Sequence, residues 1–119
     1  MQDTFILYNA QSLVNKLCEL HHILYHDKFD LVFVTETWLH ADIPSGLLDP
    51  ESMYYVLRRD RAFGHSAVCG GGVCVFVNRS LSVAETDISS VYNQLELICF
   101  ELLCVQTKLR FFHSVQAPL

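Results

Sequence analysis

The sequence predicts an α+β fold in which one main amphipathic helix, from about residue 12 to 26, packs on a mixed β-sheet. Two observations carry this prediction. Four leucines recur at helical spacing and, at 100° per residue, fall within one narrow sector; they are Leu13, Leu17, Leu20 and Leu24. Six runs rich in β-branched and aromatic residues predict strands; they lie near residues 4–9, 30–36, 53–58, 72–78, 94–104 and 108–116.

The predicted helix follows Ser12, a residue type that favours the N-cap position. Its polar face carries Asn15, Glu19, His22 and His26. The two histidines are four positions apart, a geometry that a metal ion can use. Because they share their face with Asn15 and Glu19, we interpret this face as a solvated surface.

Residues 30–36 predict the central strand of the sheet. Leu31 to Val34 are apolar on both faces, which is typical of a strand that is covered on both sides. The strand–helix–strand order then places the first two strands in one sheet. Residues 43–46 predict a loop. The glycines at 70–72 predict a flexible entrance to a hairpin and not a P-loop, because no Lys-Ser/Thr pair follows them and they open a strand.

Composition excludes several classes of protein. The chain has 119 residues, of which 51% are hydrophobic and 18% charged, so it is not intrinsically disordered. It lacks the ~18 consecutive apolar residues of a membrane helix and the features of a signal peptide. We therefore expect an intracellular protein, cytoplasmic or nuclear, that is not secreted and has no membrane partner. Its five cysteines predict reduced thiols that pack as small core hydrophobes, not a zinc site.

The net charge of −5 argues against binding of nucleic acid, because neutralising the phosphates requires cationic side chains. Any phosphate contact must therefore be local. The single basic cluster is Arg58-Arg59-Asp60-Arg61. An exposed strand end explains these arginines about as well as phosphate contact does, and both interpretations stay open.

Glu36 is the first candidate for chemistry. Alternation along the strand places it on the face of Val32 and Val34, at the carboxyl end of a buried strand, where ligands gather in α/β-type sheets. Asn9 ends the first strand at the matching edge if the two strands are parallel neighbours. A carboxylate beside a carboxamide suits a hard cation such as Mg²⁺ and the phosphate that it polarises. A turn-forming asparagine and a solvated glutamate are the ordinary alternatives.

Several motifs occur together and in order. Asn9-Ala10-Gln11-Ser12-Leu13 is followed by Thr35-Glu36-Thr37-Trp38-Leu39, Arg59-Asp60-Arg61, Gly70-Gly71-Gly72-Val73 and Leu95-Glu96-Leu97-Ile98. From residue 5 to 118 the chain resembles the endonuclease domain of non-LTR retrotransposons. These domains belong to the endonuclease/exonuclease/phosphatase superfamily, which also holds apurinic endonucleases and DNase I-like nucleases.

This resemblance implies a partial four-layer αββα sandwich, with residues 1–119 as the N-terminal half of a longer domain. It implies phosphodiester hydrolysis with Mg²⁺ or Mn²⁺ and the nicking of target DNA for retrotransposition. The implied partners are DNA, the missing C-terminal half and the reverse transcriptase of the parent protein. By the same resemblance, Glu36 matches the family's metal-holding glutamate, and Asn9 matches the asparagine that helps position metal and phosphate. Arg59 and Arg61 are the candidate DNA contacts.

The chain also departs from the family. Gln11 stands where the retrotransposon motif usually has arginine, and Gln116 and Ala117 replace the active-site tyrosine and its neighbouring arginine. The aspartate–asparagine and aspartate–histidine pairs that activate water and stabilise the scissile phosphate are missing. We therefore expect a truncated, inactive chain that binds Mg²⁺ weakly. The alternative is a non-catalytic retrotransposon relic or interaction module that self-associates through its uncovered sheet, and a phosphatase of the same superfamily is a third hypothesis.

Overall fold

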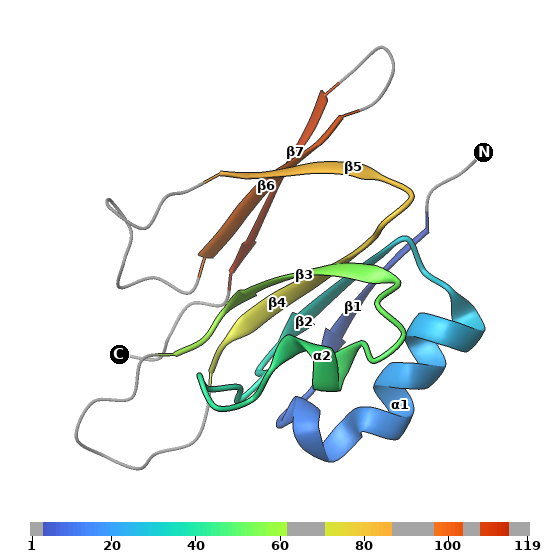
Figure 1. Cartoon of the computed structure of the whole chain (residues 1–119). Coiled ribbons are helices and arrows are strands. Elements are labelled where there is room, and N and C mark those ends of the chain that lie inside the picture. Colours follow the sequence, from blue (N-terminus) through green and yellow to red (C-terminus); the bar gives the residue numbers. More distant parts are fainter. Residues whose placement is uncertain (1–3, 62–70, 87–96, 104–107, 115–119) are drawn as a thin grey trace.

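The computed structural model describes residues 4–61, 71–86, 97–103 and 108–114 of the chain. The first part of the chain alternates strands with helical segments, and the second part contains strands. This order confirms the predicted α+β class (Figure 1). The elements are β1 (Phe5–Asn9), the 3₁₀ segment η1 (Leu13–Lys16), α1 (Leu17–His21), the π-helical segment η2 (His22–Asp27), β2 (Leu31–Thr35), α2 (Ser45–Leu48), β3 (Tyr54–Arg59), β4 (Val73–Asn78), β5 (Ser82–Thr86), β6 (Leu97–Leu103) and β7 (Lys108–Ser114).

The strands form two sheets. The first has the order β1-β2-β4-β3 and the second the order β5-β6-β7. Strands β1 and β2 lie in one sheet, as the crossover predicted, and they pair in parallel, whereas the other pairings among the described strands are antiparallel. Strand β2 lies between β1 and β4, so the central position predicted for residues 30–36 is confirmed.

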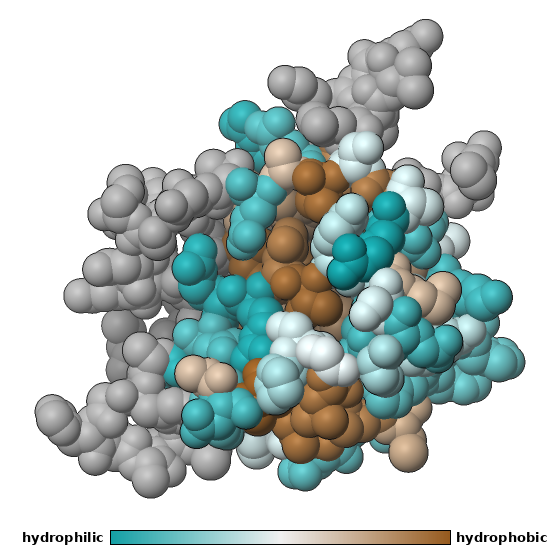
Figure 2. Space-filling view, viewed as in Figure 1, coloured by the Kyte–Doolittle hydropathy of each residue, from teal (hydrophilic) through white to brown (hydrophobic). Residues whose placement is uncertain are grey.

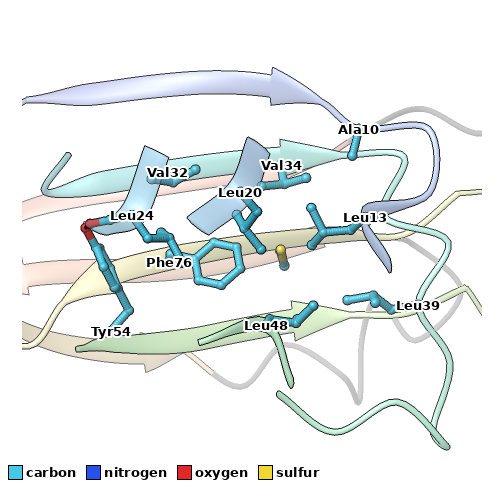
Figure 3. Close-up of a cluster of buried hydrophobic side chains, with 11 residues drawn as sticks. Ala10, Leu13, Leu20, Leu24, Val32, Val34, Leu39, Leu48, Tyr54 and Phe76 are labelled. Atoms are coloured by element: carbon cyan, nitrogen blue, oxygen red, sulfur yellow. The ribbon is translucent and has the colours of Figure 1, made fainter. Parts of the chain in front are cut away.

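The helical layer covers one face of the four-stranded sheet (Figure 1). Figure 3 shows Leu20 and Leu24 of this layer packed toward Val32 and Phe76 of the strands. The hydroxyl of Tyr54 donates to the backbone carbonyls of Leu24 (2.9 Å) and Phe29 (2.7 Å), which fastens β3 to the end of the helical segment. This core holds the first crossover against its sheet.

A second core lies between the two sheets. Leu31 and the buried valines of β4 pack against Ile98, Phe100 and Leu102 of β6. Phe100 and Phe111 stack with ring centroids 5.1 Å apart. The two sheets therefore form a sandwich, as the resemblance implied. Among the residues described, no helix is long and apolar enough to cross a membrane.

The helical segment spans residues 13–27, close to the predicted 12–26, but it changes geometry twice. Ser12 occupies the N-cap position, as predicted, but its φ is 83° and its side chain makes no capping hydrogen bond. Instead, the backbone N–H of Ser12 donates to the carbonyl of Glu36 (3.1 Å), and that of Leu13 donates to Thr37 (2.9 Å). Pairing with the segment after β2 replaces the side-chain cap, because free N–H groups at a helix start need acceptors.

Two short elements were missed. Strand β5 was not predicted, and residues 45–48 form the short helix α2 where a loop was expected. The residues of β5 whose burial is described are mostly exposed, and α2, at four residues, is too short to show a hydrophobic period. Cys74 and Cys99 are buried thiols, as predicted, whereas Cys18 is exposed. Cys69 and Cys104 lie outside the described residues.

Candidate active site

Asn9 and Glu36 lie at the carboxyl ends of neighbouring parallel strands. Asn9 of β1 is opposite Thr35 of β2, and the backbone N–H of Ala10 donates to the Thr35 carbonyl over 3.0 Å. Glu36 is the next residue along the chain. Asn9 is exposed and Glu36 half-buried, and the two positions lie at the ends of adjacent strands, at the same edge of the sheet.

The backbone at Glu36 differs from the prediction. Strand β2 ends at Thr35, and Glu36 has a φ of 55°. Strand alternation therefore does not place Glu36 on the face of Val32 and Val34, as the sequence had suggested. Its carboxylate is fixed by other contacts: Oε2 accepts hydrogen bonds from the indole N–H of Trp38 (3.0 Å) and from the backbone N–H of Gly71 (3.4 Å).

Gly71 and Gly72 hold the segment that follows β2. Thr37 N–H donates to the Gly72 carbonyl (3.2 Å), and Trp38 N–H donates to the Gly71 carbonyl (2.9 Å). Both glycines are buried and have positive φ, 69° and 89°. A β-carbon on Gly72 would overlap the Oγ1 of buried Thr37. The expected flexible entrance is thus a tightly paired segment at these two positions, and Gly70 lies outside the described residues.

The arginine cluster divides into two roles. Arg58 is largely buried, with 14% of its side chain exposed, and it pairs with Asp60 at 2.7 Å. It also donates to the backbone carbonyls of Ile43 (2.6 Å) and His40 (3.1 Å). Arg58 therefore fastens the segment before α2 to the end of β3, and phosphate contact is not needed to explain it.

Arg61 lies beside the candidate site, and Arg59 lies across the sheet from Asn9. The guanidinium of Arg61 packs against Gly71, where a β-carbon would overlap it, so this cation lies beside the glycine that donates to Glu36. The register places Arg59 opposite Val73 on one face of the sheet, in the same cross-strand row as Thr35 and Asn9. Asn9 and Arg59 are three strand spacings apart, about 14 Å.

His113 belongs to the core between the sheets. It is 6% exposed, its Nε2 lies 3.0 Å from the carbonyl oxygen of Val34, and its ring meets Phe33 edge-on. Burial lowers the pKa of His113, and the hydrogen bond to Val34 opposes this only in part. These contacts exclude His113 as an exposed general base. Gln116 lies outside the described residues.

We expect Gly72→Ala to destabilise the chain by about 1–3 kcal/mol. Alanine is strained at a φ of 89°, and its methyl group would overlap the hydroxyl of Thr37. Gly46→Ala is the matched control, because a β-carbon there meets nothing within 4 Å and alanine favours the helix α2. Urea unfolding followed by the fluorescence of Trp38, the one tryptophan of the chain, measures both. Equal stability of the two variants would contradict this role for Gly72.

Comparison with solved structures shows the same fold at low identity. The AP endonuclease LMAP from Leishmania major has a TM-score of 0.69 and 15% identity over 97% of this chain. The 3′ phosphatase NExo from Neisseria, solved with a product DNA hairpin, has a TM-score of 0.61 and 13% identity over 92%. TDP2 from D. rerio, complexed with single-strand DNA product, has a TM-score of 0.60 and 15% identity over 96%.

The sequence comparisons add no assignment: no family model matches the chain, and no curated protein matches it. The chain spans 40% of the lengths of the AP endonuclease and the 3′ phosphatase, and 47% of TDP2. It therefore has the two-sheet fold of these DNA-processing enzymes over less than half of their length.

Proposed function

We propose that this chain is the N-terminal half of a divalent-metal-dependent DNA endonuclease of the non-LTR retrotransposon type, and that it is inactive alone. The observation that carries the proposal is the Glu36 carboxylate, fixed by Trp38 and Gly71 at the end of β2 and beside the end of β1. The likeness to DNA-processing enzymes supports the nuclease fold. The retrotransposon type rests on the sequence motifs.

The residues at this edge fit a hard divalent cation. Glu36 offers a carboxylate and Asn9 an amide oxygen, the ligand types that Mg²⁺ and Mn²⁺ take in proteins. Within the described part of the chain, both hydrogen bonds to the Glu36 carboxylate go to Oε2, which leaves Oε1 for a cation. When bound, the cation would polarise a phosphate oxygen and offset the charge that develops there. Trp38 and Gly71 would hold the carboxylate in place.

DNA contact is proposed for Arg59 and Arg61. Arg61 lies against Gly71, next to the Glu36 carboxylate, so it suits a phosphate at the candidate centre. Arg59 is at the opposite edge of the sheet from Asn9, about 14 Å away, and suits a different phosphate of an extended strand. The net charge of −5 opposes binding of a polyanion, so the missing half must supply further cations.

The proposed C-terminal half has a place to pack. Leu7 is opposite Phe33, and Phe33 contacts Phe111 and His113 of β7 across the sandwich. Beyond the β7 edge of the second sheet, Phe5 and Leu7 of β1 are 70% and 68% exposed. A strand added beside β7 would cover them. Apolar side chains also gather at the surface in the middle of the face shown in Figure 2. Apolar exposure of this kind marks a surface that another segment covers.

The test compares the purified chain with one completed by a C-terminal half from a retrotransposon endonuclease. Plasmid nicking is measured with Mg²⁺, with Mn²⁺ and with a chelator. We expect background activity from the chain alone and cation-dependent nicking from the completed chain. A completed chain that folds and binds DNA without nicking would overturn the endonuclease proposal. Nicking by the chain alone would overturn its inactivity.

The second candidate is a non-catalytic interaction module that self-associates through its uncovered sheet. The exposed Phe5 and Leu7 on β1, an edge strand of the sheet as far as the structure describes it, favour it, since a second copy could cover them in place of the missing half. Sedimentation at several concentrations separates the two, because the completed chain buries this surface internally. A completed chain that stays monomeric and nicks DNA would exclude the module.

A further inference from the structure

Three possible metal ligands meet at the end of the helical segment, away from the candidate active site. His22, His26 and Asp27 each offer one ligand atom, and these atoms lie within 4.8 Å of one another. The imidazoles of His22 and His26 stack with their centroids 4.3 Å apart and their planes 16° apart. Asp27 Oδ1 lies 3.2 Å from His26 Nδ1 and 3.6 Å from His22 Nε2.

The π-helical geometry of η2 brings Asp27 into this group. The backbone N–H of Lys28 donates to the carbonyl of Ile23 over 3.0 Å, a bond five residues back along the chain. In a regular α-helix, residues five apart are about 140° apart around the axis, so Asp27 would face away from His22. The wider π turn adds one residue per turn and places residues i, i+4 and i+5 on one side.

All three side chains are accessible to an ion from solvent. The exposed fractions are 60% for His22, 74% for His26 and 38% for Asp27. The ligand atoms already lie within 4.8 Å of one another, so we expect binding to require rotation of the stacked imidazoles and no change of the backbone. The sequence predicted a solvated face for the two histidines, and the structure adds the carboxylate that the spacing of four did not include.

We propose that His22, His26 and Asp27 form a binding site for a divalent transition-metal ion, with Zn²⁺, Co²⁺ and Ni²⁺ as the class of ligand. Imidazole nitrogen suits these ions, whereas Mg²⁺ prefers an all-oxygen shell. Two imidazoles and one carboxylate make three protein ligands, and water completes the tetrahedral shell of Zn²⁺. The site is distinct from Glu36 and Asn9 in position and in ligand chemistry.

The experiment titrates the metal-free chain with Co²⁺ and follows the visible absorption of the ion, with Zn²⁺ added as competitor. We expect one ion per chain at this site. His26→Gln and Asp27→Asn are each expected to weaken binding by at least about tenfold, which corresponds to ~1.4 kcal/mol. Calorimetry with Zn²⁺ gives the same affinities independently. All substituted side chains are exposed, so circular dichroism should show an unchanged fold.

Two controls keep the assignment specific. His40 also lies near a carboxylate, with its Nδ1 3.8 Å from Asp42 Oδ2, but within the described residues they belong to no group of three ligands. We expect His40→Gln to keep full affinity. Cys18 is exposed and four residues before His22, so Cys18→Ser tests for a thiolate ligand. Unchanged affinity of His26→Gln and Asp27→Asn, or binding that depends on Cys18 alone, would overturn the proposed site.

Discussion

In the completed chain, Glu36→Gln should lower Mg²⁺-dependent nicking by about 10²–10³-fold, the usual effect of losing one group that stabilises developing charge. The glutamine carbonyl oxygen can still accept from Trp38 and Gly71, so the local fold is kept. What is lost is the negative charge that would anchor the cation. Nicking rates at saturating DNA, measured over a range of Mg²⁺ concentrations, give the size of the effect.

Glu85→Gln is the matched control, because Glu85 is an exposed carboxylate on β5 in the other sheet. It removes the same charge from the chain and should leave nicking unchanged. Partial recovery of Glu36→Gln at high Mg²⁺ would show that the defect lies in cation affinity. If both variants nick like the parent, Glu36 serves only to hold Trp38 and Gly71, and the metal assignment fails.

The segment that carries Glu36 has an unusual backbone conformation. Glu36 and Trp38 both have a φ of 55°, a region that residues with a β-carbon rarely occupy. Each such residue costs on the order of 1–3 kcal/mol. The neighbouring structure offsets this cost through the bonds of Thr37 and Trp38 to the two glycines.

The sequence predicted those elements that have a clear pattern of apolar residues. The leucine stripe located the helical segment, and the doubly apolar run of Leu31 to Val34 located the central strand. The π turn of η2 was not predictable, because it is defined by backbone hydrogen bonds, which no side-chain pattern reports. Strand β5 was missed for a similar reason, since it presents mostly exposed residues.

The candidate site was only partly predictable. Motifs pointed to Asn9 and Glu36, and the parallel pairing of β1 and β2 brings their strand ends together. One of the two donors to Glu36 is Gly71, 35 residues away, and the spacing of the sequence does not report that contact. The sequence also could not show that Arg58 has a different role from the neighbouring arginines, because its acceptors are backbone carbonyls of the segment before α2.

The second large effect concerns the core between the sheets. Phe100→Ala is expected to destabilise the chain by about 3–5 kcal/mol, the usual cost of deleting a buried phenylalanine side chain. Phe100 is fully buried, stacks on Phe111 and lies 6.2 Å from the Phe33 ring centroid across the sandwich. Small domains have about 5–15 kcal/mol in total, so this variant should be close to unfolding. Urea denaturation followed by far-ultraviolet circular dichroism measures the loss.

Phe112→Ala makes the same deletion on the next strand and should change stability little. Cys99 is opposite Phe112 in the register of β6 and β7, so Phe112 lies on the face of the sheet away from Phe100, and it is 66% exposed. Comparison of the two variants therefore separates the effect of burial on stability from the effect of residue type. If Phe112→Ala costs as much as Phe100→Ala, the outer face of this sheet is covered in solution. Since no other segment is added in this experiment, the cover would be a second copy of the chain, and stability would then rise with protein concentration.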